Sequence, residues 1–145
     1  MNYAAQQDII DAYGEDALLT IADRDGDNVI DALIVDRALT RATSEIDAAF
    51  RNRYVTPLVT VPEDIRAVAV DMARYFLAGT PGASDDEIRT RYEDARKTLD
   101  AYANGKRQLD APPVSQPASG QIVISAKSSV FGDGALGGFT KGGTR

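Results

Sequence analysis

Apolar residues in the first 104 positions of this 145-residue chain recur every three or four places, which sets them on one face of an α-helix. A helix with one apolar face must bury that face against another helix, so the spacing predicts an all-α fold. Three stripes carry the prediction: Ile30, Leu33, Ile34, Leu39, Ala42, Ile46, Ala49 and Phe50; Ile65, Val68, Ala69, Met72 and Phe76; and Ile88, Tyr92, Ala95, Leu99 and Tyr102.

Glycine, proline and capping residues predict where the helices begin and end. Gly14 separates two short helices, and Ser84 with Glu87 three residues later has the spacing of a capping box. We therefore expect a small bundle of about four to five helices in residues 1–104. The expected helices cover about residues 5–13, 15–22, 30–52, 62–78 and 84–104.

Residues 105–145 have a different composition, with 8 of the 12 glycines and 3 of the 6 prolines. We interpret them as an extended, partly β C-terminal arm that orders on a partner, with a disordered terminus as the alternative. A strand is predicted in QIVISAKSSVF, which contains Ile122 and Ile124. Phe131, Leu136 and Phe139 are apolar anchors that a simple spacer would not need, so these five residues are candidates for partner binding.

The composition narrows the chemistry available to the protein. The chain has no cysteine and no histidine, which removes disulfides, thiolate chemistry and the commonest general base. No motif assembles an active site, and we expect a protein that is not an enzyme and needs no cofactor. The first residues have no basic region followed by a long apolar one, so we expect no signal peptide and a cytoplasmic location.

Charge is unevenly distributed along the chain. Residues 1–104 contain 11 basic and 20 acidic residues, a net charge of −9, whereas residues 105–145 contain 5 and 2, a net charge of +3. An acidic body argues against a DNA-binding or regulatory protein, because phosphate-backbone binding needs a basic surface. The basic arm is suited to an acidic surface, its own or a neighbour's.

The segment DRDGDNVID holds four aspartates, Asp23, Asp25, Asp27 and Asp31, at the first, third, fifth and ninth places of an EF-hand-like loop. Carboxylates at these places are ligands that Ca²⁺ prefers. Two departures weaken the match: Asn28 occupies the glycine place, and Ile34 occupies the place of the bidentate glutamate. The other interpretation, which we favour, is a solvated turn in which Asp27 caps the next helix.

Four features together resemble the small neck proteins encoded among the morphogenesis genes of Mu-like phages. They are GED between two short helices, the aspartate loop, the run A…EID…F…RY…PL, and the MARY helix. The helix RYEDARKTLDAYANGK and the pair Phe131 and Phe139 extend the resemblance over nearly the whole chain. That family commonly has glycine near the place of Asn28. Ion binding in relatives would therefore not by itself imply ion binding in this chain.

The resemblance implies a head–tail adaptor of a tailed phage or prophage, similar to the helical adaptors of long-tailed phages. Such a protein forms a ring of about twelve copies beneath the portal. Its expected partners are other copies of itself, the portal protein, and a stopper or tail-completion protein. DNA would pass through the ring without specific binding, and the protein would lie in the virion neck after assembly in the host cytoplasm. A calcium-binding interaction module is the alternative.

Overall fold

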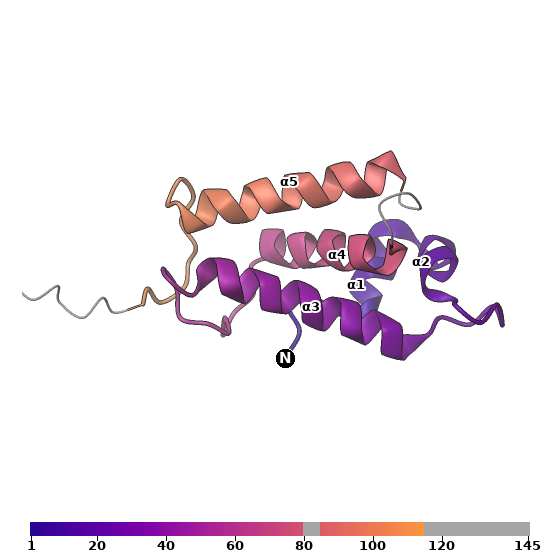
Figure 1. Ribbon diagram of the computed structural model, residues 1–145. Coiled ribbons are helices and arrows are strands. Elements are labelled where there is room, and N and C mark those ends of the chain that lie inside the picture. Colours follow the sequence, from indigo (N-terminus) through magenta and orange to yellow (C-terminus); the bar gives the residue numbers. More distant parts are fainter. Residues whose placement is uncertain (80–84, 115–145) are drawn as a thin grey trace, which may run out of the picture. The chain divides into compact units, whose positions relative to one another are not determined.

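The computed structural model describes residues 1–79 and 85–114 of the chain. Within these ranges every helix or strand is an α-helix: α1 (Gln6–Tyr13), α2 (Glu15–Ala22), α3 (Ala32–Phe50), α4 (Glu63–Ala78) and α5 (Asp86–Ala103) (Figure 1). The predicted all-α bundle is therefore confirmed. The predicted β part of the arm lies outside the described residues. None of the described helices is long and apolar enough to cross a membrane.

Helix α4 is the centre of the bundle and contacts each of the other four helices. Figure 1 shows α3, α4 and α5 side by side, with α4 between the other two. Helices α1 and α2 are joined at Gly14, whose φ of 90° is readily available to glycine. They pack against α3 and α4.

The predicted stripes form the core where the helices meet. Phe50 is fully buried and makes edge-to-face contacts with Tyr54 and Tyr102, at ring-centroid distances of 5.7 and 6.1 Å. Each fully buried large apolar side chain contributes roughly 1.5–3 kcal/mol. The largest of them are Phe50, Ile9, Leu18, Ile46, Leu58, Ile65, Met72, Leu99 and Val35.

Helix α3 begins later than the sequence predicted, and one residue of its predicted stripe is wrong. The carboxylate of Asp31 accepts hydrogen bonds from the N–H groups of Leu33 and Ile34, at 3.2 and 3.4 Å, and so caps the helix at Ala32. Asp27, the predicted cap, instead accepts from Val29 N–H at 2.9 Å. Leu33 is 59% exposed, because the buried face of α3 follows the phase of Val35, Leu39 and Ala42.

Helix α5 begins at Asp86, with Asp85 at the N-cap position. The predicted cap Ser84 lies outside the described residues. Glu87, its predicted partner, lies 3.6 Å from Arg74 and 3.7 Å from Arg91.

Residues 105–114 pack on the bundle. Leu109 is buried, and its N–H donates to the hydroxyl of Tyr54 at 3.1 Å. Tyr54 also forms an isolated antiparallel bridge with Pro113. The compact unit that the structure describes therefore extends to Val114. The division into functional regions at residue 104 stays a prediction.

Candidate functional site

The aspartate loop folds around the carboxylate of Asp23. Its Oδ1 accepts from Gly26 N–H at 2.7 Å and from Asp27 N–H at 3.2 Å, and its Oδ2 accepts from Asn28 N–H at 3.0 Å. Asn28 has a φ of 61°, the left-handed conformation expected for the residue in the glycine place. The loop is thus a turn held by backbone amides that converge on one carboxylate.

Three of the four predicted metal ligands come together in this loop. Asp23, Asp25 and Asp27 each offer a carboxylate oxygen, and these oxygens lie within 4.8 Å of one another. Asp31 is not in this group, because its carboxylate caps α3. Ile34, at the place of the bidentate glutamate, packs against the hydrophobic core.

The pKa values of Asp23 and Asp25 are shifted in opposite directions. Partial desolvation, the largest influence, acts to raise the pKa of Asp23, but the backbone hydrogen bonds from Gly26, Asn28 and Asp27 together lower it. The pKa of Asp25 is raised. The backbone N–H of Asp27 acts to lower it, but the negative charge of Asp27, desolvation and side-chain hydrogen bonds together outweigh that hydrogen bond. The carboxylates of Asp25 and Asp27 repel each other, so a cation or a basic partner near the loop would be favourable.

Elsewhere, three tyrosine–aspartate hydrogen bonds hold the bundle together. The hydroxyl of Tyr3 donates to Asp47 on α3. Tyr13 at the end of α1 donates to Asp71 on α4, and Tyr102 on α5 donates to Asp64 on α4. Each bond joins two segments that are distant in sequence.

Burial and these hydrogen bonds raise the pKa values of the tyrosines. Burial, followed by the hydrogen bond to Asp47, raises the pKa of Tyr3 to about 12. Burial and Asp71 likewise raise the pKa of Tyr13 to about 12. Desolvation also raises the pKa of Asp71, although Tyr13 and two nearby arginines act to lower it. These shifts follow from burial within the fold and need no catalytic role.

Arg74 on α4 is paired rather than free. Its guanidinium lies 3.9 Å from the ring centre of Tyr13 and 3.6 Å from a carboxylate oxygen of Glu87. Next to Arg74, Tyr75 on α4 stacks on Tyr92 on α5, with 4.0 Å between the ring centroids.

A recess of about 550 Å³ opens beside Tyr13. Carboxylates and guanidinium groups dominate its polar lining, and one of those carboxylates, Asp71, already accepts from Tyr13. The polar lining residues are Asp8, Asp11, Tyr13, Glu63, Arg66, Asp71 and Arg91. We find in this set no pairing of a nucleophile with a free general base.

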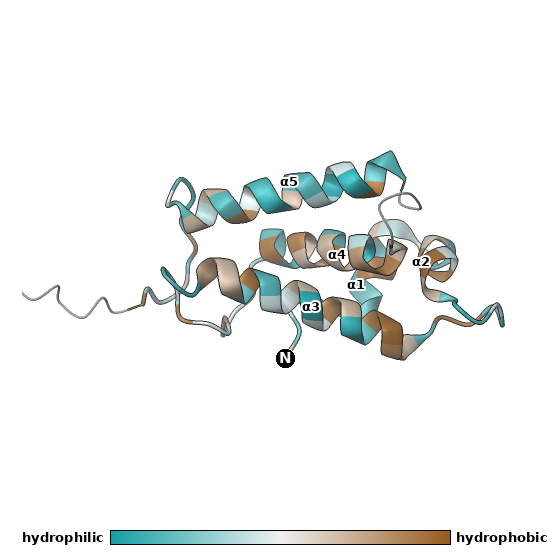
Figure 2. Ribbon diagram, in the orientation of Figure 1, coloured by the Kyte–Doolittle hydropathy of each residue, from teal (hydrophilic) through white to brown (hydrophobic). Residues whose placement is uncertain are grey.

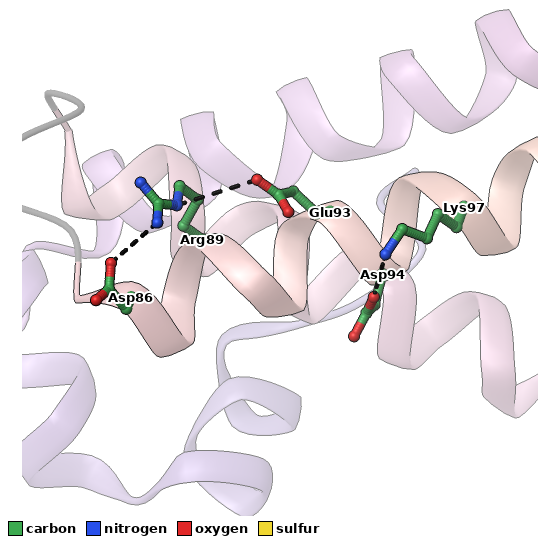
Figure 3. A network of polar contacts seen from close by, with 5 residues as sticks. All are labelled: Asp86, Arg89, Glu93, Asp94 and Lys97. Atoms are coloured by element: carbon green, nitrogen blue, oxygen red, sulfur yellow. Dashed lines mark hydrogen bonds and ion pairs between the residues drawn. The ribbon is translucent and has the colours of Figure 1, made fainter.

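The exposed charges of α5 are mostly paired within the helix. Figure 3 shows Arg89 between Asp86 and Glu93, at 3.0 and 4.0 Å, and Lys97 paired with Asp94 at 2.9 Å. Arg96 is the exception, because it pairs with Glu45 on α3 at 3.2 Å.

The predicted partner-binding residues Ile122, Ile124, Phe131, Leu136 and Phe139 lie outside the described residues. Sequence reasoning missed the tyrosine–aspartate bonds. One signal was present: Asp71 interrupts an apolar stretch of α4, and a carboxylate in such a place needs a hydrogen-bonding partner.

Comparison with known proteins places this chain among phage proteins. The family model described as Bacteriophage Mu, Gp36 matches residues 3–125. A relative from Haemophilus influenzae, the Mu-like prophage FluMu protein gp36, is 32% identical over 140 residues. That alignment covers 94% of this chain and 97% of the relative.

The protein is thus of the phage-encoded class that the sequence resemblance pointed to. The chain belongs to the Bacteriophage Mu Gp36 family.

Proposed function

We propose that the protein is a structural head–tail adaptor of a tailed phage or prophage. About twelve copies form a ring under the portal, extend the DNA channel and join the head to the tail. The observation that carries the proposal is the use of the polar side chains. The tyrosine–aspartate bonds join the N-terminal segment to α3, and α1 and α5 to α4, which suits a rigid building block rather than an enzyme.

The proposed partners are other copies of the protein, the portal protein, and a stopper or tail-completion protein. The net charge of −9 in residues 1–104 supports a channel through which DNA slides without binding. The five apolar residues of the arm, Ile122, Ile124, Phe131, Leu136 and Phe139, are proposed to anchor it on a partner. In this proposal the working location is the neck of the virion.

An add-back experiment tests the adaptor. Purified protein is mixed with DNA-filled heads from a phage mutant that lacks it, tails are added, and joined particles are counted by electron microscopy and plaque titre. We expect the protein at the portal vertex and a rise in infectious particles. A double variant, Phe131→Ser with Phe139→Ser, should fold like the wild type and yet join fewer tails. Heads that bind no protein would refute the adaptor.

Calcium binding at the aspartate loop is a second candidate, favoured by the three carboxylate oxygens within 4.8 Å. The lack of a carboxylate at Ile34 would leave the site weaker than a sensor EF-hand. Isothermal titration at physiological salt tests it, with Asp25→Asn as the matched variant. Heat that the variant abolishes would support calcium binding, and no heat at millimolar calcium would exclude it.

A further inference from the structure

Exposed apolar side chains gather at the two ends of α3. Apart from Met1, the large exposed hydrophobic residues of the described chain are Val29 and Leu33 at the start of α3, and Val55 and Val59 after its end. They are 62, 59, 50 and 87% exposed, respectively. Figure 2 shows hydrophobic colouring both on the first turn of α3 and on the loop that follows the helix. The 19 residues of α3 separate the two places by about 28 Å.

The two ends carry opposite charge. The acidic end, residues 23–33, has four acidic residues and one basic residue, a net charge of −3. The basic end comprises residues 51–59 and 104–110, which lie side by side because Leu109 N–H bonds to Tyr54. It has four basic residues and one acidic residue, a net charge of +3.

The bases of the basic end have no acidic partner within the described residues. Arg51, Arg53, Lys106 and Arg107 take part in none of the ion pairs of the folded unit. The bases of α5 behave differently, since Arg89, Arg91, Arg96 and Lys97 all have carboxylate partners. At the acidic end, Asp25 and Asp27 are exposed and repel each other. Each end therefore offers what the other lacks.

We propose that the acidic end of one copy docks on the basic end of the next copy. Val29 and Leu33 would cover Val55 and Val59, and loop aspartates would meet Arg51 and Lys106. Two acidic ends would repel each other, so a pairing of like ends is disfavoured. An antiparallel pair of copies would use both unlike contacts at once and stop at a dimer, whereas the ring of the proposed function needs a head-to-tail contact that leaves one end of each kind open. Association beyond the dimer distinguishes the two arrangements. A head-to-tail contact closes into a ring or continues as a filament, according to the rotation between copies. The inference rests on the proposed function, whose ring it supplies with an interface.

Charge reversal at each end tests the contact by sedimentation velocity. We expect the wild type to associate with increasing concentration, and more weakly at high salt. Asp25→Lys with Asp27→Lys leaves both ends basic, and Arg51→Glu with Lys106→Glu gives the basic end a net negative charge. Each double variant alone should associate at least tenfold more weakly. An equimolar mixture of the two should associate again, because copies of unlike charge can alternate.

A matched control separates this contact from a general effect of charge. Asp11→Lys with Glu93→Lys changes the net charge by the same amount as the acidic-end variant, on exposed positions of α1 and α5. It should associate like the wild type. Circular dichroism and thermal melting establish that each variant is folded.

Cysteine cross-linking tests the orientation, because the natural chain has no cysteine. A protein with Val29→Cys and a second with Val59→Cys, each carrying a tag of different mass, are mixed and oxidised. Random coupling gives as much mixed disulfide dimer as the two like-with-like dimers together, and we expect the mixed dimer to exceed that sum. A mixed dimer no more abundant than the two like-with-like dimers together would overturn the head-to-tail contact. So would a wild type that stays monomeric up to its solubility limit, or charge variants that associate as it does.

The result is distinguishable from the test of the adaptor. If heads bind the protein and join tails while the charge variants act like the wild type, the adaptor stands and this interface is wrong. If the charge variants behave as expected while heads bind no protein, the interface stands and the adaptor is wrong.

Discussion

The hydroxyl of Tyr3 makes two hydrogen bonds inside the fold, so its removal should be costly. It donates to Asp47 and accepts from the N–H of Leu58 at 2.8 Å, and both Tyr3 and Leu58 are buried. Tyr3→Phe keeps the ring and removes both bonds. A hydrogen bond to a charged group contributes roughly 1.5–3 kcal/mol, and a buried unpaired N–H costs about 1–3 kcal/mol. Asp47 is only half-buried and can recover water, so we expect a net loss of about 2–4 kcal/mol.

Urea unfolding followed by circular dichroism measures this loss. With an m value of about 1.5 kcal/mol/M, the midpoint should fall by roughly 1–3 M at an unchanged slope. Tyr75→Phe is the matched control, since its half-buried hydroxyl has no hydrogen bond within the described residues, and it should cost about 0.5 kcal/mol or less. Hydrogen exchange at Leu58 should quicken only in Tyr3→Phe. A midpoint no lower than that of the control would refute the reasoning.

The same hydroxyl gives the stability a dependence on alkaline pH. The pKa of Tyr3 is raised from 10.0 to about 12 in the folded protein. Between these values the unfolded chain loses a proton that the folded protein keeps, so the stabilisation present below pH 10 is lost as the pH rises toward 12. Tyr3→Phe should show a smaller drop in unfolding free energy between neutral pH and the middle of that window. An equal drop in both proteins would mean that Tyr3 does not titrate as described.

Substitutions at two further positions, Asp71 and Gly105, test the origin of local stability. Asp71→Asn should change the free energy of unfolding at neutral pH by less than about 1 kcal/mol, because burial already disfavours the charge and the amide oxygen can still accept from Tyr13. Asp71→Ala, measured in the same urea assay, should cost about 1–3 kcal/mol by leaving that hydroxyl unpaired, and equal losses in the two variants would contradict this. Gly105→Ala should cost about 1 kcal/mol because Gly105 has a φ of +75°. An added Cβ would also lie 2.5 Å from a guanidinium nitrogen of Arg53. The Arg53→Ala background separates the two causes. The loss of stability should persist there if backbone strain causes it, and it should vanish if the clash with Arg53 causes it.

The helices were predictable because their apolar periodicity is a local property, whereas their ends depended on individual side chains. The start of α3 was misplaced because either Asp27 or Asp31 could cap it, and only the folded loop selects Asp31. The same choice sets which residues face the core, so Leu33 was wrongly assigned to the buried stripe.

The polar contacts between helices were less predictable than the helices. The pairing of Arg96 with Glu45 needs the packing of α5 on α3, which no spacing within one helix can specify. The aspartate loop shows both sides of this limit. The left-handed conformation of Asn28 follows from the sequence pattern. The sequence did not show that Asp31 caps α3 while Asp23, Asp25 and Asp27 lie close together, because that depends on how the loop folds.

The distribution of charge along the chain bears on the proposed contact between copies. The acidic end, residues 23–33, has a net charge of −3, whereas the basic end, residues 51–59 and 104–110, has a net charge of +3. If the charge served solubility alone, it would not need to be separated along the length of α3. Separating the charges in this way should make the stability of one copy and the association of copies respond to salt in opposite directions. Within one copy the crowded loop aspartates repel each other, so added salt should slightly stabilise the fold. In the proposed contact between copies the opposite ends would attract, so the same salt should weaken association. Opposite responses to salt in the two measurements would therefore show that the charges are placed for a neighbour, and parallel responses would show that they are not.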